Sequence, residues 1–288
     1  MVAPLMDHVV ISFEFFPPKT DDQRELLHKS VPKLKVFAPE YVSVTFGAGG
    51  STLDYTVDTV STLKSQYALD AAPHLSCMGG TRAEIKRLLD TYVAMGCKRI
   101  VALRGDMPSG MASSGDFNYA AELVSYIRRE YGDHFHIEVG AYPEFHPQSD
   151  SADADLTHFV DKINAGADGA ITQYFFNADA YFHFLDDVTA RGVAVPIVPG
   201  IMPIGNFSQL KRFSDMCGTE IPRWLTKRML GFGDDAQSVR DYGADVVAEL
   251  CDQLVGGGVE ALHFYTLNRA KSTLDVLERL GVKAKFGG

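Results

Sequence analysis

The chain has few of the residues that mark disulfide-rich, metal-binding or membrane proteins. Its four cysteines, Cys77, Cys97, Cys217 and Cys251, lie far apart among 288 residues and match no CxxC or zinc spacing. No stretch approaches about 18 uninterrupted apolar residues, the length that spans a bilayer. The first residues also lack the basic cluster and apolar run of a signal peptide. We therefore expect a cytoplasmic protein with reduced thiols.

Positive charge is also scarce. The sequence holds 27 Lys and Arg residues against 37 Asp and Glu residues, which gives a net charge of −10. Nucleic acids and anionic membranes are bound by basic faces, so neither is an expected partner. An anionic small ligand would have to be held by a few local positive groups. Because 46% of the residues are hydrophobic, the chain can bury a sizeable core.

Several motifs of catalysis and nucleotide binding are missing. There is no GxxxxGK[ST], HExxH or GxSxG sequence and no histidine-rich cluster that predicts a metal site. The glycine-rich stretch 47–52 lacks the third glycine of GxGxxG, and we interpret it as a tight strand-to-helix turn capped by Ser51 or Thr52. No predicted strand contains the lysine that a Schiff-base aldolase needs.

Short apolar runs recur at intervals of roughly 30 residues, with amphipathic segments between them, as in alternating strands and helices. The runs predict strands at 9–16, 41–46, 72–77, 99–105, 136–142, 170–175, 196–201 and 261–267. The helix-like intervals include 23–37, 52–67, 81–96, 119–131 and 153–166, and Thr81 with Glu84 forms a capping box. Before the last strand, 206–217, 221–230 and 234–256 predict extra helices.

Strand–helix alternation over the whole length predicts a parallel sheet with right-handed crossovers. Eight such units fit an α/β fold, a (β/α)8 TIM barrel with extra helices between strands seven and eight. We find no linker or charge block, so residues 1–288 are expected to form a single domain. A doubly wound sheet is the alternative, but it usually carries a glycine-rich phosphate turn after its first strand, where this chain has Pro17-Pro18-Lys19-Thr20.

The predicted strands end in polar residues, and a closed barrel would bring these ends around one mouth, where active sites of this fold lie. They are Glu14, Thr45, His74, Arg104-Gly105-Asp106, Tyr142 with Glu144 and His146, Gln173, and Asn268-Arg269. Each residue alone also has a structural interpretation. His74 would suit a hydrogen-bonded core histidine, Arg104 and Asp106 an ion pair beside a turn, and Phe213 helix packing.

The same residues carry a resemblance to a known family. Seven motifs, in order from about residue 10 to 280, resemble those of methylenetetrahydrofolate reductases. They are Ser12-Phe-Glu14-Phe-Phe-Pro-Pro, Val42-Ser-Val-Thr45, Ala72-Pro-His74-Leu, Val101-Ala-Leu-Arg104-Gly-Asp106, Ala141-Tyr-Pro-Glu-Phe-His146-Pro, Ile171-Thr-Gln173-Tyr-Phe-Phe and His263-Phe-Tyr265-Thr-Leu-Asn-Arg269. The family's fold is a (β/α)8 barrel, which agrees with the independent prediction from periodicity. The resemblance is to the bacterial-type catalytic domain.

The resemblance implies an FAD-dependent oxidoreductase that reduces 5,10-methylenetetrahydrofolate to 5-methyltetrahydrofolate, with electrons from NAD(P)H through the reduced flavin, in one-carbon metabolism and methionine biosynthesis. Glu14 matches the family's general acid, and Asp106 matches a carboxylate beside flavin and pterin. The resemblance assigns substrate contacts to Glu14, Asp106, Gln173, Gln209, Phe213, Tyr265, Leu267 and Arg269. It assigns flavin contacts to Thr45, His74, Arg104, Gly105, Asp106, Tyr119, Ala120, Tyr142, His146, Asp155 and Lys162.

The position of Glu14 in an apolar strand has a physical explanation. Side chains alternate along a strand, so Ser12 and Glu14 face one way while Phe13 and Phe15 face the other, and the first set can point into a barrel mouth. We also expect the phenylalanines around Glu14 to favour its neutral, proton-donating form by desolvation. Asp106, which follows a basic residue and a glycine, is expected to stay ionised as an electrostatic partner.

The resemblance is incomplete in one helix, where His158 and Asp161 stand in place of an amide and an arginine and one positive charge is lost. Because of this departure, the sequence does not determine the FAD affinity. It also does not decide whether NADH, NADPH or a protein donates the electrons. The resemblance implies a homo-oligomer, because relatives are commonly homo-oligomers, but not the number of subunits. Two other classes of function stay open. One is a pterin-binding methyl-transfer barrel without a redox cofactor, and the other is a folate-binding paralogue without catalysis.

Overall fold

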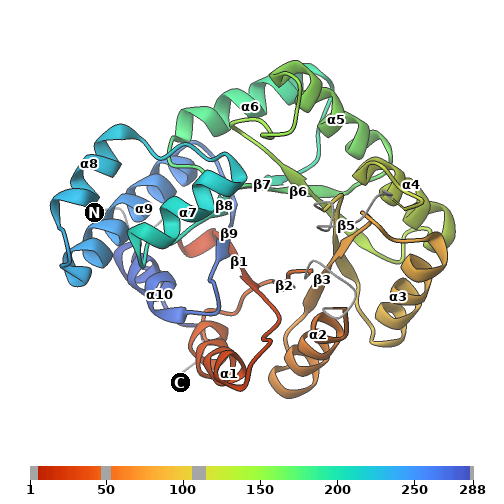
Figure 1. Cartoon of the computed structure of the whole chain (residues 1–288), viewed down its shortest axis with the longest axis horizontal. Coiled ribbons are helices and arrows are strands. Elements are labelled where there is room, and N and C mark those ends of the chain that lie inside the picture. Colours follow the sequence, from red (N-terminus) through yellow and green to blue (C-terminus); the bar gives the residue numbers. More distant parts are fainter. Residues whose placement is uncertain (1–5, 47–52, 106–114, 286–288) are drawn as a thin grey trace.

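Strands and helices alternate along the chain as the sequence predicts (Figure 1). The computed structural model describes residues 6–46, 53–105 and 115–285. The strands in these residues are β1 (Val10–Phe15), β2 (Val42–Val44), β3 (Ala71–Ser76), β4 (Arg99–Leu103), β5 (His136–Ala141), β6 (Gly169–Thr172), β7 (Ile197–Val198), β8 (Gly200–Ile201) and β9 (Ala261–Tyr265). A 3₁₀ turn at Met6–His8 precedes β1.

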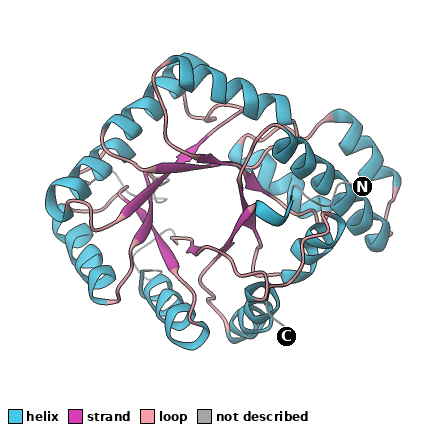
Figure 2. Ribbon diagram, turned by 180° about the vertical axis from the view of Figure 1, so that it is seen from behind, coloured by secondary structure: helices cyan, strands magenta, loops and turns pink. Residues whose placement is uncertain are grey.

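The strands form one parallel sheet in the order β7-β6-β5-β4-β3-β2-β1-β9-β8. The two ends of this order, β7 and β8, are consecutive in the chain, so the sheet closes into a ring (Figure 2). Only Pro199 separates them, where the sequence predicts a continuous strand 196–201. Proline has no N–H to donate, but its carbonyl accepts from the backbone N–H of His263 at 3.1 Å. The (β/α)8 barrel is thus confirmed, with its seventh strand interrupted at Pro199.

Helices surround the ring on its outside (Figure 2). They are α1 (Asp21–Lys35), α2 (Leu53–Tyr67), α3 (Arg82–Ala94), α4 (Ala120–Tyr131), α5 (Ala152–Asn164), α6 (Ala178–Ala190), α7 (Phe207–Cys217), α8 (Arg223–Gly231), α9 (Ala236–Gly256) and α10 (Ala270–Arg279). The extra helices predicted before the last strand are α7, α8 and α9, and the Thr81–Glu84 capping box is present. Within the described ranges, none of these helices is both long and apolar enough to cross a membrane.

Two differently composed regions lie on the two sides of the barrel wall. Outward-facing strand residues such as Phe13, Phe15 and Leu75 are almost fully buried against the helices, in the large hydrophobic core. The interior of the ring holds a smaller apolar cluster of Tyr41, Ala72, Val101 and Ile171. It also holds buried polar residues, namely Ser12, Ser43, His74, Glu138, Thr172 and His263. Burying polar groups costs free energy unless they are paired, so this interior indicates a functional rather than a purely structural arrangement.

Candidate active site

Glu14 lies near the carboxyl end of β1 and points into the barrel, as strand alternation predicts. Its Oε2 is 3.3 Å from Nε2 of His74 on β3, and its side chain keeps 19% exposure. The contact lacks hydrogen-bond geometry, so His74 Nε2 has no hydrogen-bond partner among the described residues. Burial lowers the pKa of His74, and this effect outweighs the opposing influence of Glu14.

The carboxyl of Glu14 opens into a cavity of about 230 Å³ at the mouth of the barrel. Six of the predicted site residues line this cavity together: Glu14, His74, Tyr142, Gln173, Tyr265 and Leu267. They come from strand ends that are up to about 250 positions apart in sequence, and closure of the ring brings them together. The expected convergence at one mouth is therefore present for these residues.

The surroundings of Glu14 differ from one expectation. Phe13 and Phe15 are at most 1% exposed in the core outside the barrel wall, on the opposite side of β1 from Glu14. They therefore cannot desolvate the carboxyl by contact, because successive side chains of a strand point to opposite faces. The groups that shield it from water are those of the barrel interior, among them His74 and Tyr265.

Gln173 and Tyr265 present defined hydrogen-bonding groups at this cavity. The backbone N–H of Tyr174 donates to Oε1 of Gln173 at 3.0 Å, which directs the remaining amide hydrogens to other acceptors. The Tyr265 hydroxyl donates to the carbonyl of Thr172 at 2.6 Å. Burial raises the pKa of Tyr265 well above its ordinary value, so this phenol stays neutral.

A second cavity, of about 370 Å³, continues from the first and shares Met202, Tyr265 and Leu267 with it. It contains the other predicted substrate contacts, namely Gln209 and Phe213 on α7 and Arg269 at the start of α10. Leu267 and Asn268 both have positive φ, at 51° and 57°, which bends the chain sharply after β9. Arg240 and Lys271 also line this cavity, so its far side is positively charged in an otherwise acidic protein.

Most residues that the resemblance assigns to flavin lie beside the mouth, along the loops after β2, β4 and β5, and line neither cavity. The ring of Tyr119, at the start of α4 next to Ala120, is 50% exposed and stacks on His158 at 5.3 Å between centroids. Thr45 follows β2, where its carbonyl accepts from the Thr56 hydroxyl at 3.1 Å. The substituted position His158 is therefore part of the same surface as Tyr119.

Asp155 organises the loop between β5 and α5. Its Oδ2 accepts from the backbone N–H of His146 and its Oδ1 from the Ser149 hydroxyl, both at 3.0 Å. Lys162, two turns further along α5, donates through Nζ to the carbonyl of Gly140. Burial lowers the pKa of Lys162 to about 8. The sequence predicts flavin contacts at Asp155, His146 and Lys162, and the structure gives each of them a place in this loop–helix junction.

Gly105 has no room for a side chain. Its φ is +79°, and a Cβ at this position would lie 1.9 Å from Oγ of Ser76. The neighbouring guanidinium of Arg104 donates to Oε1 of Gln148 across the β4 and β5 loops. Asp106, which the resemblance names as a catalytic and cofactor-binding residue, lies outside the described residues, as does the glycine-rich turn at 47–52 with Ser51 and Thr52.

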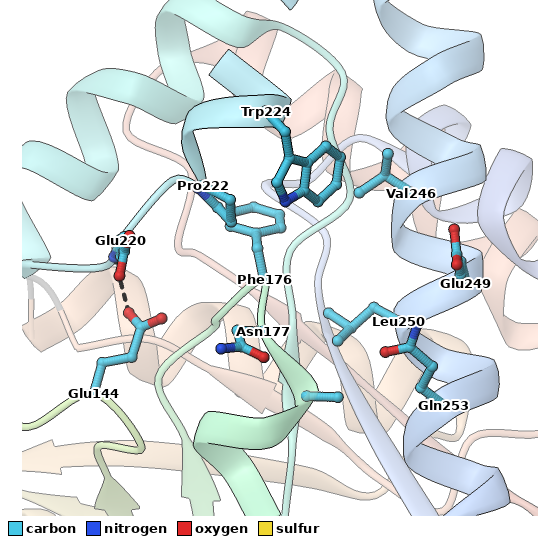
Figure 3. Close-up of a pocket in the computed structure, with 11 residues that line it drawn as sticks. Glu144, Phe176, Asn177, Glu220, Pro222, Trp224, Val246, Glu249, Leu250 and Gln253 are labelled. Carbon is cyan, nitrogen blue, oxygen red and sulfur yellow. Dashed lines mark hydrogen bonds between the residues drawn. The ribbon is translucent and has the colours of Figure 1, made fainter. Parts of the chain in front are cut away.

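Another cavity, of about 390 Å³, is lined by none of the residues that the resemblance assigns to the site (Figure 3). Trp224, Phe176 and Leu250 form its apolar walls, and the backbone N–H of Glu220 donates to Oε2 of Glu144 at 2.8 Å along its edge. Of the strand-end residues noted in the sequence, it contains Glu144 alone. Its acidic and aromatic lining does not suit an anionic substrate, and neither Glu14 nor His74 lines it.

Three buried polar residues next to the site have no role in the resemblance, although Asn268 is among the predicted polar strand ends and Ser12 is predicted to face inward with Glu14. His263 and Ser12 lie behind Glu14 in the barrel interior, and Asn268 ties the chain after β9 to the end of β1. All three occur in the quoted motifs. The period-two pattern that places Ser12 with Glu14 on the inward face would also have placed His263 there with Tyr265.

Comparisons with known proteins agree with this geometry. The family model described as methylenetetrahydrofolate reductase matches residues 3–281. The chain belongs to the methylenetetrahydrofolate reductase family. It is 42% identical to the 5,10-methylenetetrahydrofolate reductase of Pectobacterium carotovorum over 98% of this chain and 93% of the relative. The Escherichia coli reductase is 40% identical, over 98% of this chain and 94% of its own length. Family membership makes the chain an oxidoreductase that acts on a tetrahydrofolate substrate.

The plant relatives are longer. Methylenetetrahydrofolate reductase (NADH) 1 of Arabidopsis thaliana is 38% identical over 94% of this chain but only 48% of the plant protein. Among solved structures, a Clostridium thermocellum protein that binds two copies of 5-methyltetrahydrofolate superposes with a TM-score of 0.66, at 18% identity, over 97% of this chain and 98% of that one. At this identity the likeness shows that the reductase shares the barrel fold.

Proposed function

We propose that this reductase uses FAD to reduce 5,10-methylenetetrahydrofolate to 5-methyltetrahydrofolate, with Glu14 as the proton donor. The observation that carries the proposal is the position of the Glu14 carboxyl, which lies at the base of the mouth cavity within 3.3 Å of a His74 ring that burial keeps neutral. An acid that must give up a proton near neutral pH needs such a partly desolvated site without a neighbouring cation.

The residues beside the mouth fit a flavin dinucleotide. Tyr119 offers an exposed aromatic face that is already stacked on His158, and aromatic faces suit planar ring systems. Lys162 supplies a positive charge for a phosphate, and the missing Cβ of Gly105 allows close approach to the backbone. His74 leaves a ring nitrogen without a hydrogen bond among the described residues. When bound, the flavin supplies the hydride.

The chain's own residues would then manage the folate. The five-membered ring between N5 and N10 opens when the Glu14 O–H bond breaks and a new N–H bond forms at N10. The electron pair of the breaking carbon–N10 bond goes to N10, and an iminium cation remains at N5. Gln173, whose Oε1 accepts from the backbone N–H of Tyr174, orients the pterin through its amide hydrogens. Asp106 is proposed to stabilise the cation by its negative charge.

The two connected cavities divide the substrate by polarity. The pterin end lies with Glu14 and Gln173 in the first cavity, and the glutamate end reaches the second, where Arg269 offers a positive charge. Gln209, Phe213 and the Tyr265–Leu267 segment form the wall that the folate shares with the nicotinamide of NAD(P)H. Because one mouth serves both, the two substrates bind in turn, as a ping-pong sequence requires.

The test separates the two half-reactions under anaerobic conditions. Protein reconstituted with FAD is mixed first with NADH or NADPH, and flavin absorbance reports reduction. Methylenetetrahydrofolate is added next, and the return of absorbance reports folate reduction. We expect Glu14→Gln to keep the first step and to slow the second by about 100-fold or more, the usual contribution of general acid catalysis.

Glu144→Gln is the matched control, because Glu144 is a carboxyl at the same end of the barrel that does not line the Glu14 cavity. It should leave both steps close to the wild-type rates. Folate reduction at the wild-type rate in Glu14→Gln would remove the assignment of the acid. A protein that binds folate but takes up no FAD would instead support the pterin-binding barrel without a redox cofactor.

A further inference from the structure

His263 lies in the barrel interior, directly behind the proposed acid, and the mechanism above does not use it. Its side chain is fully buried on β9, with no exposure to the cavity or to bulk solvent. Interiors of this fold are usually filled by branched apolar residues, so a buried imidazole needs hydrogen-bonding partners. It has them on both ring nitrogens.

Strand register places these partners beside it. Ser12 on β1 lies opposite His263, and Glu14 pairs with both Ser43 on β2 and Tyr265 on β9. The Ser12 hydroxyl is 2.7 Å from Nδ1 of His263, and the Ser43 hydroxyl is 3.2 Å from Nε2. The same Nε2 is 4.0 Å from Oε2 of Glu14. The register of three adjacent strands thus places the Ser12 hydroxyl, the His263 ring and the Glu14 carboxyl next to one another.

The carboxyl decides which ring nitrogen carries the hydrogen. If Ser12 donates to Nδ1, the hydrogen is on Nε2 and faces the oxygens of Ser43 and Glu14. The opposite tautomer would direct the Nε2 lone pair towards the carboxylate oxygen, which is electrostatically unfavourable once Glu14 is charged. The hydrogen on Nε2 is therefore the arrangement that fits the step in which Glu14 loses its proton.

We propose that His263 is a positioning residue for the general acid: its Nε2–H, held by Ser12, stabilises the carboxylate that Glu14 becomes. The proposal rests on the proposed role of Glu14. No bond to His263 forms or breaks in the step. The proton leaves the Glu14 oxygen for the substrate nitrogen, and the negative charge that remains lies 4.0 Å from Nε2 of His263, where it interacts with the N–H electrostatically.

Other titratable groups around this pair do not take over the role. The Tyr265 hydroxyl is committed to the Thr172 carbonyl. Tyr41 stacks on the other side of His263, with ring centroids 5.8 Å apart. Beneath Tyr41, the guanidinium of Arg99 is paired with Glu138 at 2.7 Å and Glu40 at 2.9 Å, so its charge is already compensated. His74 faces Glu14 from the cavity side, but no hydrogen bonds hold its Nε2 in place among the described residues, whereas both ring nitrogens of His263 are held by serine hydroxyls.

Two amide substitutions distinguish a donor from a space-filling group. In His263→Gln the amide nitrogen reaches approximately the position of Nε2, whereas in His263→Asn it reaches only that of Nδ1. We expect His263→Asn to slow folate reduction by about tenfold and His263→Gln to recover most of that loss, by analogy with removal of a preorganised donor at longer range. Flavin reduction by NADH should keep its wild-type rate in both.

The split between the two half-reactions is the readout that a merely structural role would not change. Without the Nε2–H, the charge left on Glu14 after proton transfer is less stabilised, so folate reduction alone should slow in His263→Asn. Ser12→Ala removes the group that fixes the tautomer and should slow the same step to a smaller extent, and it carries the test if His263→Asn does not fold.

Equal slowing of both half-reactions, or a wild-type rate of folate reduction in His263→Asn and Ser12→Ala, would overturn the inference. The outcome is separable from that of the proposed function. If Glu14→Gln is inactive in folate reduction and the His263 and Ser12 variants behave as wild type, only the inference about His263 fails. If Glu14→Gln is active, the proposed acid itself is wrong.

Discussion

Lys162 offers a quantitative test of the electrostatics beside the mouth. Its ammonium group is buried at the end of α5, donates to the Gly140 carbonyl and lies 5.3 Å from the ring centroid of Phe159. Burial lowers its pKa from 10.5 to about 8, against the opposing influence of Asp155. The folded protein therefore binds this proton less tightly than the unfolded chain does. The free energy of unfolding should rise as pH increases from about 8 towards 10.5.

The magnitude follows from the two pKa values. The full difference corresponds to about 3 kcal/mol, and about 2 kcal/mol of it should develop between pH 7 and pH 9.5. Because Lys162 keeps partial contact with solvent, we expect about 1–2 kcal/mol. Lys162→Met keeps the apolar stem and removes the titrating group. The wild type should thus gain that amount of stability relative to the variant between the two pH values.

Urea unfolding of the FAD-free protein, followed by circular dichroism near pH 7 and near pH 9.5, measures the difference. Lys29→Met is the control, since Lys29 is 66% exposed on α1 and distant from the mouth. Its pH dependence should match that of the wild type. If the stability difference between wild type and Lys162→Met is the same at both pH values, Lys162 is not desolvated as argued. Flavin fluorescence should also show weaker FAD binding by Lys162→Met at neutral pH.

Two further substitutions test how the mouth is held together. Asn268→Ala should lower the free energy of unfolding by about 2–4 kcal/mol, because its amide pairs with both the N–H and the carbonyl of Phe16, at 2.9 and 2.8 Å, and both would be left unpaired. A urea titration measures the loss, and equal stability of Asn268→Ala and the wild type would contradict this account. Gly200→Ala should cost about 1–3 kcal/mol, since its Cβ would lie 2.2 Å from the Thr172 carbonyl oxygen. Gly231→Ala, whose Cβ would meet nothing within 4 Å, is the control, and equal melting temperatures for the two variants would refute the steric argument.

Much of the barrel could be predicted because its signals are local. Buried strands read as short apolar runs, and the helices between them show a 3.6-residue period with caps such as Thr81–Glu84. The break at Pro199 was missed because an apolar run with a proline at its centre still resembles one strand. Its two halves, β7 and β8, differ only in their partners, β6 and β9, and pairing partners are a property of the closed sheet.

The site shows the same division. Alternation along β1 was enough to send Glu14 into the barrel, and the resemblance named most of the residues that line the two cavities. The expectation that phenylalanines desolvate Glu14 was wrong for Phe13 and Phe15, which lie behind the wall. The contacts that surround the carboxyl come from His74 on β3 and His263 on β9, at 3.3 and 4.0 Å.

The sequence by itself determined the order of strands and helices and the direction in which each strand side chain points, because these depend on residues a few positions apart. The tertiary structure alone decided which inward-facing side chains meet. Ser12 and His263 are 251 positions apart and hydrogen bonded. Closure of the ring pairs the first strand with the last, and no local sequence period predicts a contact between residues so far apart in the chain.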